Sequence, residues 1–239
     1  MEFQDNRFHD IKKLQSMPYL IRTFLSFALL ISMTGPILAM GEAVSTGISS
    51  NKSNELQESS QICAKAIAPI ERIGNLPSQL LQAIALTESG RWDKGRQAKF
   101  AWPWTVTAGG SGKFFDTRKQ AIDYVRALQA KGTRNIDVGC MQVNLKYHPN
   151  AFANLEQAFN PHVNVAYAGE LVQKLRVSTL SWAQAVRHYH SSHPVKGRKY
   201  WRKFQSTWFK EARNAAEKTR IERVEFFRKW QMARLASRR

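Results

Sequence analysis

One short segment constrains the fold more than any other part of this sequence. From Leu80 to Glu88 the apolar residues recur at helical spacing, Pro77 stands in the predicted first turn, and Ser89-Gly90 ends the pattern. The residues on one side of this helix are Leu80, Leu81, Ile84, Ala85 and Glu88. Because so apolar a helix is stable in water only when it is buried, we expect it inside a domain, with Glu88 at its C-terminal end.

Most of the remaining chain also has helical patterns. We expect helices over 117–131, 164–175 and 181–190, and a further helical segment over 61–73. The one clear strand signal is a β-hairpin from Phe100 to Phe115, whose turn is supplied by glycines. With 239 residues, 43% of them hydrophobic, the sequence predicts one mainly α domain with a small β-hairpin.

The N-terminal segment has the features of an export signal. Basic residues precede the apolar run FLSFALLISM, and Gly35-Pro36 breaks this run before small residues that suit cleavage. We expect residues 1–40 to be a signal peptide; the alternative is an N-terminal anchor, because 19–39 is just long enough to cross a bilayer. Either alternative predicts an exported protein, in the periplasm or associated with the membrane. The polar, serine-rich stretch 41–60 is predicted to be a flexible linker.

The two cysteines are informative in an exported chain. Cys63 and Cys140 are an even pair in an oxidising compartment, so we expect a disulfide between them rather than two free thiols. Its long loop puts the bond at the favourable end of loop-entropy stabilisation.

Charge separates the end of the chain from the rest. The formal net charge is +18, and residues 196–239 contain 15 Lys+Arg against 4 Asp+Glu. We expect a basic helical tail over 205–239, with one stripe made of Ile221, Val224, Phe227, Gln231 and Leu235. An anionic surface or a component of the cell-envelope machinery suits this tail, whereas an export signal argues against nucleic acid.

The position of Glu88 has a chemical consequence. Burial and the negative end of the helix dipole both disfavour an ionised carboxylate, so the pKa of Glu88 should rise. A carboxyl group with a raised pKa can act as the general acid that breaks a glycosidic bond. The alternative is structural: Glu88 extends to solvent or pairs with an arginine at the helix end.

Four ordered motifs resemble those of the soluble lytic transglycosylases, a lysozyme-like family, over roughly residues 61–202. They are Leu80 to Gly90, Asp137 to Asn144, Asn160 to Ala168, and Ala185 to Ser191. The resemblance implies a goose-type lysozyme-like catalytic domain over 61–204. It also implies cleavage of the N-acetylmuramic acid–N-acetylglucosamine bond in peptidoglycan glycan strands, without a cofactor, to leave a 1,6-anhydro end.

The same resemblance assigns roles to particular residues. Glu88 is the implied catalytic acid and base, and Ser89 orients it. Met141 and Gln142 are expected to line the sugar subsites, and Tyr189 to hydrogen-bond near the acid. In two places the chain departs from the family, because Cys140 replaces a leucine and His190 stands where the family commonly has asparagine. The first departure fits a disulfide beside the cleft.

Two alternatives to this function remain. A lysozyme-like muramidase would need a second carboxylate, for which Asp137 is the obvious candidate, although a residue just before Gly139 is more often in a turn or cap. A non-catalytic cell-wall binding or assembly protein would act through its tail. No metal is expected, because the histidines at 188, 190 and 193 lack further ligands at the right spacing. Trp102 and Trp104 suit a sugar cleft and a core about equally.

Overall fold

The structure is a computed structural model that describes residues 45–237, with side chains from residue 58 onward. The predicted signal peptide or anchor, residues 1–40, lies outside the described residues. The fold is mainly helical, as the sequence predicts, and it contains two small antiparallel sheets. Along residues 45–237, no helix combines the length and hydropathy that a membrane span requires.

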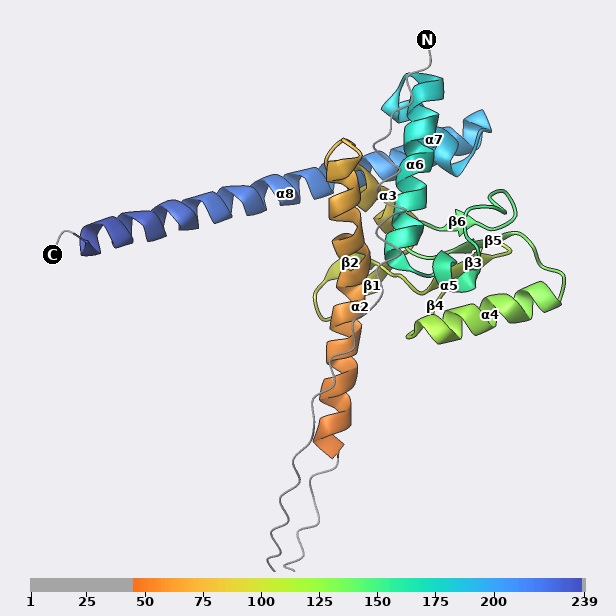
Figure 1. The fold of residues 1–239 in the computed structure, drawn as a ribbon, viewed down its shortest axis with the longest axis horizontal. Helices are drawn as coiled ribbons and strands as arrows, with labels where there is room; N and C mark the ends of the chain where they lie inside the picture. Colours follow the sequence, from red (N-terminus) through yellow and green to blue (C-terminus); the bar gives the residue numbers. More distant parts are fainter. Residues whose placement is uncertain (1–44, 238–239) are drawn as a thin grey trace, which may run out of the picture. The chain divides into compact units, whose positions relative to one another are not determined.

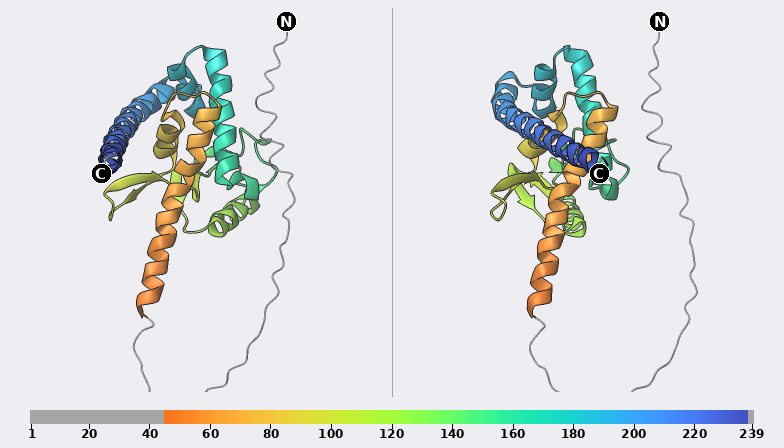
Figure 2. Two further views of the ribbon diagram at one scale, coloured as in Figure 1. Left: turned by 60° about the vertical axis from the view of Figure 1, so that its left-hand side comes forward. Right: turned by 90° about the vertical axis from the view of Figure 1, so that its left-hand side faces the viewer.

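Five helices build the larger of two cores (Figure 1). They are α2 (Ser45–Ile73), α3 (Leu80–Glu88), α6 (Pro161–Thr179), α7 (Trp182–His190) and the first part of α8 (Pro194–Ala236). The short helix α3 lies between α2 and α8, and α6 runs along α2 (Figure 2). Every residue of α3 from Leu80 to Thr87 except Gln82 is buried, so the prediction of a central apolar helix is confirmed.

The N-terminal end of α3 is held by a side chain from another helix. The residue before α3, Gln79, has a left-handed backbone and gives no side-chain cap. The buried carboxylate of Glu71 on α2 takes this role, because its oxygens accept the backbone N–H groups of Gln79, Leu81 and Gln82 at 2.9, 2.7 and 3.2 Å. A negative group here also suits the positive end of the helix dipole. Glu71 thereby fixes the helix that ends in Glu88.

The second core lies between a four-stranded sheet and helix α4 (Arg118–Ala130). The sheet order is β4 (Ser111–Phe114), β3 (Thr105–Ala108), β5 (Ile136–Val138) and β6 (Val143–Asn144), all antiparallel. The expected hairpin is β3–β4, and it turns at Gly109-Gly110, both with positive φ. The short helix α5 (Leu155–Ala158) closes this core with Phe159.

The structure adds strands that the sequence did not indicate. A separate hairpin, β1 (Gly90–Asp93) with β2 (Ala98–Ala101), follows α3 immediately. Strands β5 and β6 come from a stretch for which the sequence predicted neither a helix nor a strand. All of these strands have four residues or fewer, too short for an alternating pattern to stand out from the surrounding sequence.

The predicted disulfide is present. Cys63 on α2 and Cys140 after β5 are bonded, with their Cα atoms 5.7 Å apart, and both side chains are buried. The bond joins the helical core to the loop between β5 and β6.

The predicted linker is wrong for most of its length, since α2 already begins at Ser45. Residues 41–44 lie outside the described part. The physical reason is cooperativity: packing of Ala66 and Ile67 in the core fixes the later turns, and each further residue then adds a hydrogen bond at little cost.

The basic tail does not begin as a separate helix either. It is the continuation of α8, whose first half is anchored in the core by Tyr200 and Phe204, at 6% and 0% exposure. Beyond Trp208 the apolar side chains are exposed, among them Phe226, Phe227 and Trp230.

Candidate active site

A cavity of about 400 Å³ lies where the four-stranded sheet meets α3, α6 and α7. The residues that line it are Glu88, Thr107, Gly110, Asn135, Asp137, Gln142, Val143, Asn144, Tyr147, His148, Leu171, Tyr189 and His190. The cavity therefore brings together Glu88, Gln142 and Tyr189, which were predicted as site residues from three separate motifs.

Glu88 is desolvated and yet reachable from the cavity. Its side chain is 18% exposed, and its pKa is raised from 4.5 to about 7. Burial is the largest cause; the charge of Asp137 raises the pKa further, whereas Tyr200 and Lys203 lower it. Near neutral pH a large share of the protein therefore carries a protonated Glu88, the form that a general acid requires.

Two residues of α8 surround Glu88 that no sequence motif indicated. Tyr200 is buried. Its hydroxyl lowers the pKa of the Glu88 carboxyl, while burial and Glu88 raise the pKa of Tyr200 well above 10. The hydroxyl of Tyr200 completes no hydrogen bond of good geometry among the described residues. Lys203 donates to the carbonyl of Thr87 at 3.0 Å, which places its charge at the end of α3.

His190 contacts both Glu88 and Tyr200. Its Nδ1 is 4.0 Å from Oε1 of Glu88, and its ring stacks on the ring of Tyr200 with centroids 4.4 Å apart. Burial, Lys203 and Lys196 lower the pKa of His190 below 6.5, so the imidazole is mainly neutral at pH 7. The contact with Glu88 is therefore not an ion pair at that pH, and the stacking contact holds the Tyr200 ring in place.

Asp137 corrects our expectation of a turn or cap residue. It lies inside β5, paired with Thr107 and Asn144, and its carboxylate lines the same cavity as Glu88. Asn144 donates to it at 2.8 Å, which lowers its pKa, while burial raises the pKa more strongly. The turn begins only at Gly139, which has a φ of 82°, so Asp137 remains in extended backbone.

Gln142 forms part of the cavity wall, but its amide is occupied. Its Nε2 donates to the carbonyls of Thr105 and Gly139, both at 3.0 Å, and its Oε1 accepts from Thr107 at 2.6 Å. Only 8% of the residue is exposed. In this arrangement Gln142 shapes the wall instead of offering free hydrogen bonds to a ligand.

Neither Ser89 nor Met141 is on the cavity surface, so Met141 does not line the cavity as the resemblance implied. Both are fully buried. The Ser89 hydroxyl donates to the carbonyl of Cys140 at 2.6 Å, and the Met141 carbonyl accepts the Tyr189 hydroxyl at 2.7 Å. These contacts connect the end of α3 and helix α7 to the loop between β5 and β6. Ser89 and Met141 therefore stabilise the walls of the site without facing the cavity.

One buried asparagine, Asn164 on α6, fixes the loop between β5 and β6. Asn164 accepts the N–H of Met141 at 2.9 Å and donates to the carbonyls of Val138 and Ala158. A Cβ at position 139 would lie 2.6 Å from the Asn164 amide nitrogen, so only glycine fits there. The helix cap itself is Asn160, which accepts the N–H groups of His162 and Val163.

Tyr189 lines the cavity as a neutral phenol. Burial, Glu88 and Asp137 raise its pKa well above 10. Neither Trp102 nor Trp104 lines this cavity: Trp102 is 3% exposed, and Trp104 packs on the second core. Among residues 45–237, no three His, Cys, Asp or Glu side chains group in a way that could hold a metal ion.

Comparison with known proteins adds no further information about this site. No protein-family model, no curated protein and no solved structure matches the chain. The function is therefore inferred from the cavity itself and from the four motifs that resemble the soluble lytic transglycosylases.

Proposed function

We propose that this protein is a peptidoglycan lytic transglycosylase, with a lysozyme-like catalytic domain over 61–204 and Glu88 as its acid. The observation that carries the proposal is the raised pKa of Glu88, about 7, at the wall of a cavity that Asp137, Tyr189 and His190 also line. The four motifs supply the substrate class, and the sugar chain of the bacterial wall is the polymer that they imply.

The first step uses Glu88 in its protonated form. It gives its proton to the oxygen between N-acetylmuramic acid and N-acetylglucosamine, and the bond from that oxygen to C1 breaks. The positive charge that develops at C1 is stabilised by the substrate's own N-acetyl oxygen. Asp137, across the same cavity, adds a negative charge that favours this cationic centre.

The second step uses the carboxylate that remains. Glu88 takes the proton of the muramyl 6-hydroxyl, whose oxygen attacks C1 and closes the 1,6-anhydro ring. Glu88 is then protonated again, and no water is consumed. Tyr189 and His190 line the cavity in which this hydroxyl approaches C1, and both side chains are neutral.

A muramidase is the second candidate, and one observation favours it. Asp137 stands in the same cavity as Glu88, so two carboxylates are available, as hydrolysis by water commonly requires. The two candidates use one acid and differ only in whether water or the 6-hydroxyl reaches C1. A non-catalytic binding role remains the third candidate.

The deciding experiment is mass spectrometry of fragments released from purified peptidoglycan. We expect fragments lighter by one water than hydrolytic products, and loss of about 100-fold or more in rate for Glu88→Gln. Glu225→Gln, on the exposed part of α8, is the matched control. Hydrolytic products instead would establish the muramidase, and unaffected release by Glu88→Gln would exclude Glu88 as the acid.

The cellular setting belongs to the same proposal. The Cys63–Cys140 disulfide is compatible with an exported protein, and we place the enzyme in the periplasm, where its substrate lies. The exposed, basic second half of α8 would contact an anionic surface or a component of the envelope machinery.

A further inference from the structure

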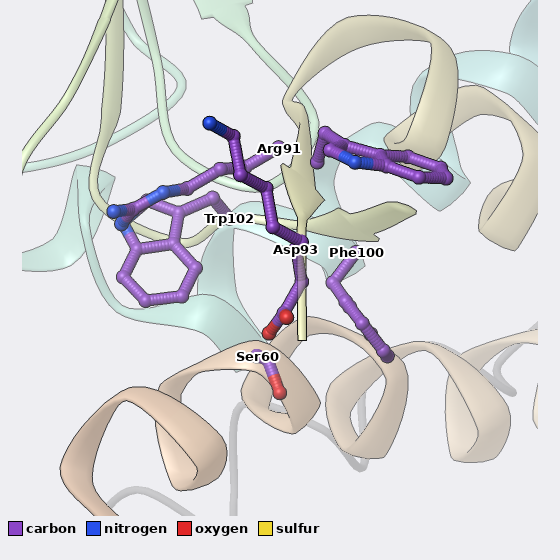
Figure 3. A pocket seen from close by; sticks show the side chains of 7 residues that line it. Ser60, Arg91, Asp93, Phe100 and Trp102 are labelled. Carbon is purple, nitrogen blue, oxygen red and sulfur yellow. The ribbon is translucent and has the colours of Figure 1, made fainter. Parts of the chain in front are cut away.

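A second cavity, of about 230 Å³, lies along strand β1 and shares no lining residue with the cavity of Glu88. Figure 3 shows its walls: Arg91 and Asp93 on β1, Phe100 and Trp102 beyond them, and Ser60 on α2. Trp92 of β1 and Lys94, in the turn that follows β1, also line it, and both are exposed, Trp92 at 54%.

This cavity combines an aromatic surface with cations. The Arg91 guanidinium lies over the Trp102 ring, 4.4 Å from its centroid, and Figure 3 shows the two side chains together on one side of the cavity. Stacking fixes the guanidinium plane, while 35% of the side chain stays exposed. A planar, partly exposed guanidinium is the group that best recognises a carboxylate.

The charges of the cavity leave it positive. Asp93 is offset by Arg96, whose Nη1 lies 3.6 Å from it and whose backbone N–H donates to it at 3.0 Å. Arg91 forms a salt bridge with Asp116, whose carboxylate lies 3.8 Å from Nη1, beyond hydrogen-bond distance; Nη1 is buried and has no hydrogen bond among residues 45–237, while the rest of the guanidinium is partly exposed. Lys94, by contrast, makes no ion pair among residues 58–237, so its positive charge is not offset. The ligand is therefore expected to be an anion.

The position of the cavity suggests what carries that anion. Strand β1 begins two residues after Glu88, so Arg91 is at most about 10 Å of chain from the proposed acid. In the described part of the chain β1 pairs only with β2, so the outer edge of β1 is left open. The cavity along β1 therefore lies close along the chain to the residue at which the glycan is proposed to be cleaved.

We propose that the cavity along β1 binds the carboxylates of the peptide that substitutes the glycan, a substrate subsite outside the catalytic cavity. Arg91 and Lys94 bind the carboxylates, and Trp92 packs on the apolar part of the peptide. The inference rests on the proposed function for its choice of ligand, but binding at this cavity does not require cleavage.

Calorimetric titration of the full chain carrying Glu88→Gln tests the subsite separately from the enzymatic activity. The probes are a wall stem peptide with free carboxylates and the same peptide with those groups amidated; neither contains a glycosidic bond. We expect the free acid to bind at least about tenfold more tightly than the amide. The further change Trp92→Ala with Lys94→Ala should remove that preference.

The matched control is Lys229→Ala with Trp230→Ala, an exposed lysine–tryptophan pair on α8. It should leave the preference unchanged. Equal affinity for the two peptides, or an unchanged preference after substitution at Trp92 and Lys94, would overturn the subsite. If the proposed function is wrong, purified peptidoglycan will release no fragments, but the result of this titration will not change.

Discussion

Replacing Glu88 by glutamine should stabilise the fold at alkaline pH while it removes catalysis. The pKa of Glu88 is raised from 4.5 to about 7 in the folded protein, so the folded state binds more protons than the unfolded state between these pH values. Stability must then fall as pH rises through this window. At 1.36 kcal/mol per pH unit, the full difference is about 3 kcal/mol above pH 7 and vanishes below pH 4.5.

Glutamine carries no titrating group, so the variant escapes this loss. For a chain of this size 1 kcal/mol corresponds to about 2–4 °C in Tm, and Glu88→Gln should therefore melt roughly 6–12 °C above wild type at pH 8. At pH 4 the two proteins should melt within about 2 °C of each other. Calorimetric scans at both values measure the effect.

Glu225→Gln, an exposed acid on α8, provides the control and should follow wild type at both pH values. A Glu88→Gln variant whose Tm difference from wild type is the same at pH 4 and pH 8 would refute the reasoning. That result would mean that Glu88 is hydrated in the folded state and ionises at its ordinary pKa.

Two further predictions follow from the contacts of the site. The rate of glycan cleavage should fall about tenfold between pH 6 and pH 8 as Glu88 ionises. Because Asp137 raises the pKa of Glu88 and Lys203 lowers it, Asp137→Asn should move this decline to lower pH and Lys203→Met should move it to higher pH. If neither variant moves the pH–rate profile, these two residues do not shift the pKa of Glu88. Replacing Cys63 and Cys140 together by alanine should lower the free energy of unfolding by about 4–5 kcal/mol, because the bond closes a loop with a sequence separation of 77. Urea denaturation measures this, and a loss under about 1 kcal/mol would contradict it.

Local sequence was enough to predict the helix that carries Glu88. Helical spacing, Pro77 and Ser89-Gly90 all act within one stretch of chain, and so do the glycines of the β3–β4 turn. The disulfide was predictable for a different reason: only two cysteines exist, so one pairing is possible.

The surroundings of Glu88 were not predictable in the same way. Tyr200 and Lys203 lie at the end of the predicted catalytic domain, where no motif indicated a site residue, and α8 brings them to Glu88 through tertiary packing. Asp137 was predicted to be a turn or cap residue because a glycine follows two positions later. Only the pairing of β5 with β3 shows that Asp137 is in a strand. An aromatic repeat at Tyr200, Phe204 and Trp208 was the one local signal that this segment enters the core.

The environments of the two carboxylates assign their roles under the proposed function. Glu88 is desolvated and also experiences the charge of Asp137, so two causes favour its protonated form. Asp137 receives a hydrogen bond from Asn144, which favours its charged form and opposes the larger effect of burial on its pKa. A protonated acid beside an ionised neighbour is the arrangement that glycosidic cleavage needs, so Glu88 donates the proton and Asp137 stabilises the cation, whichever nucleophile follows.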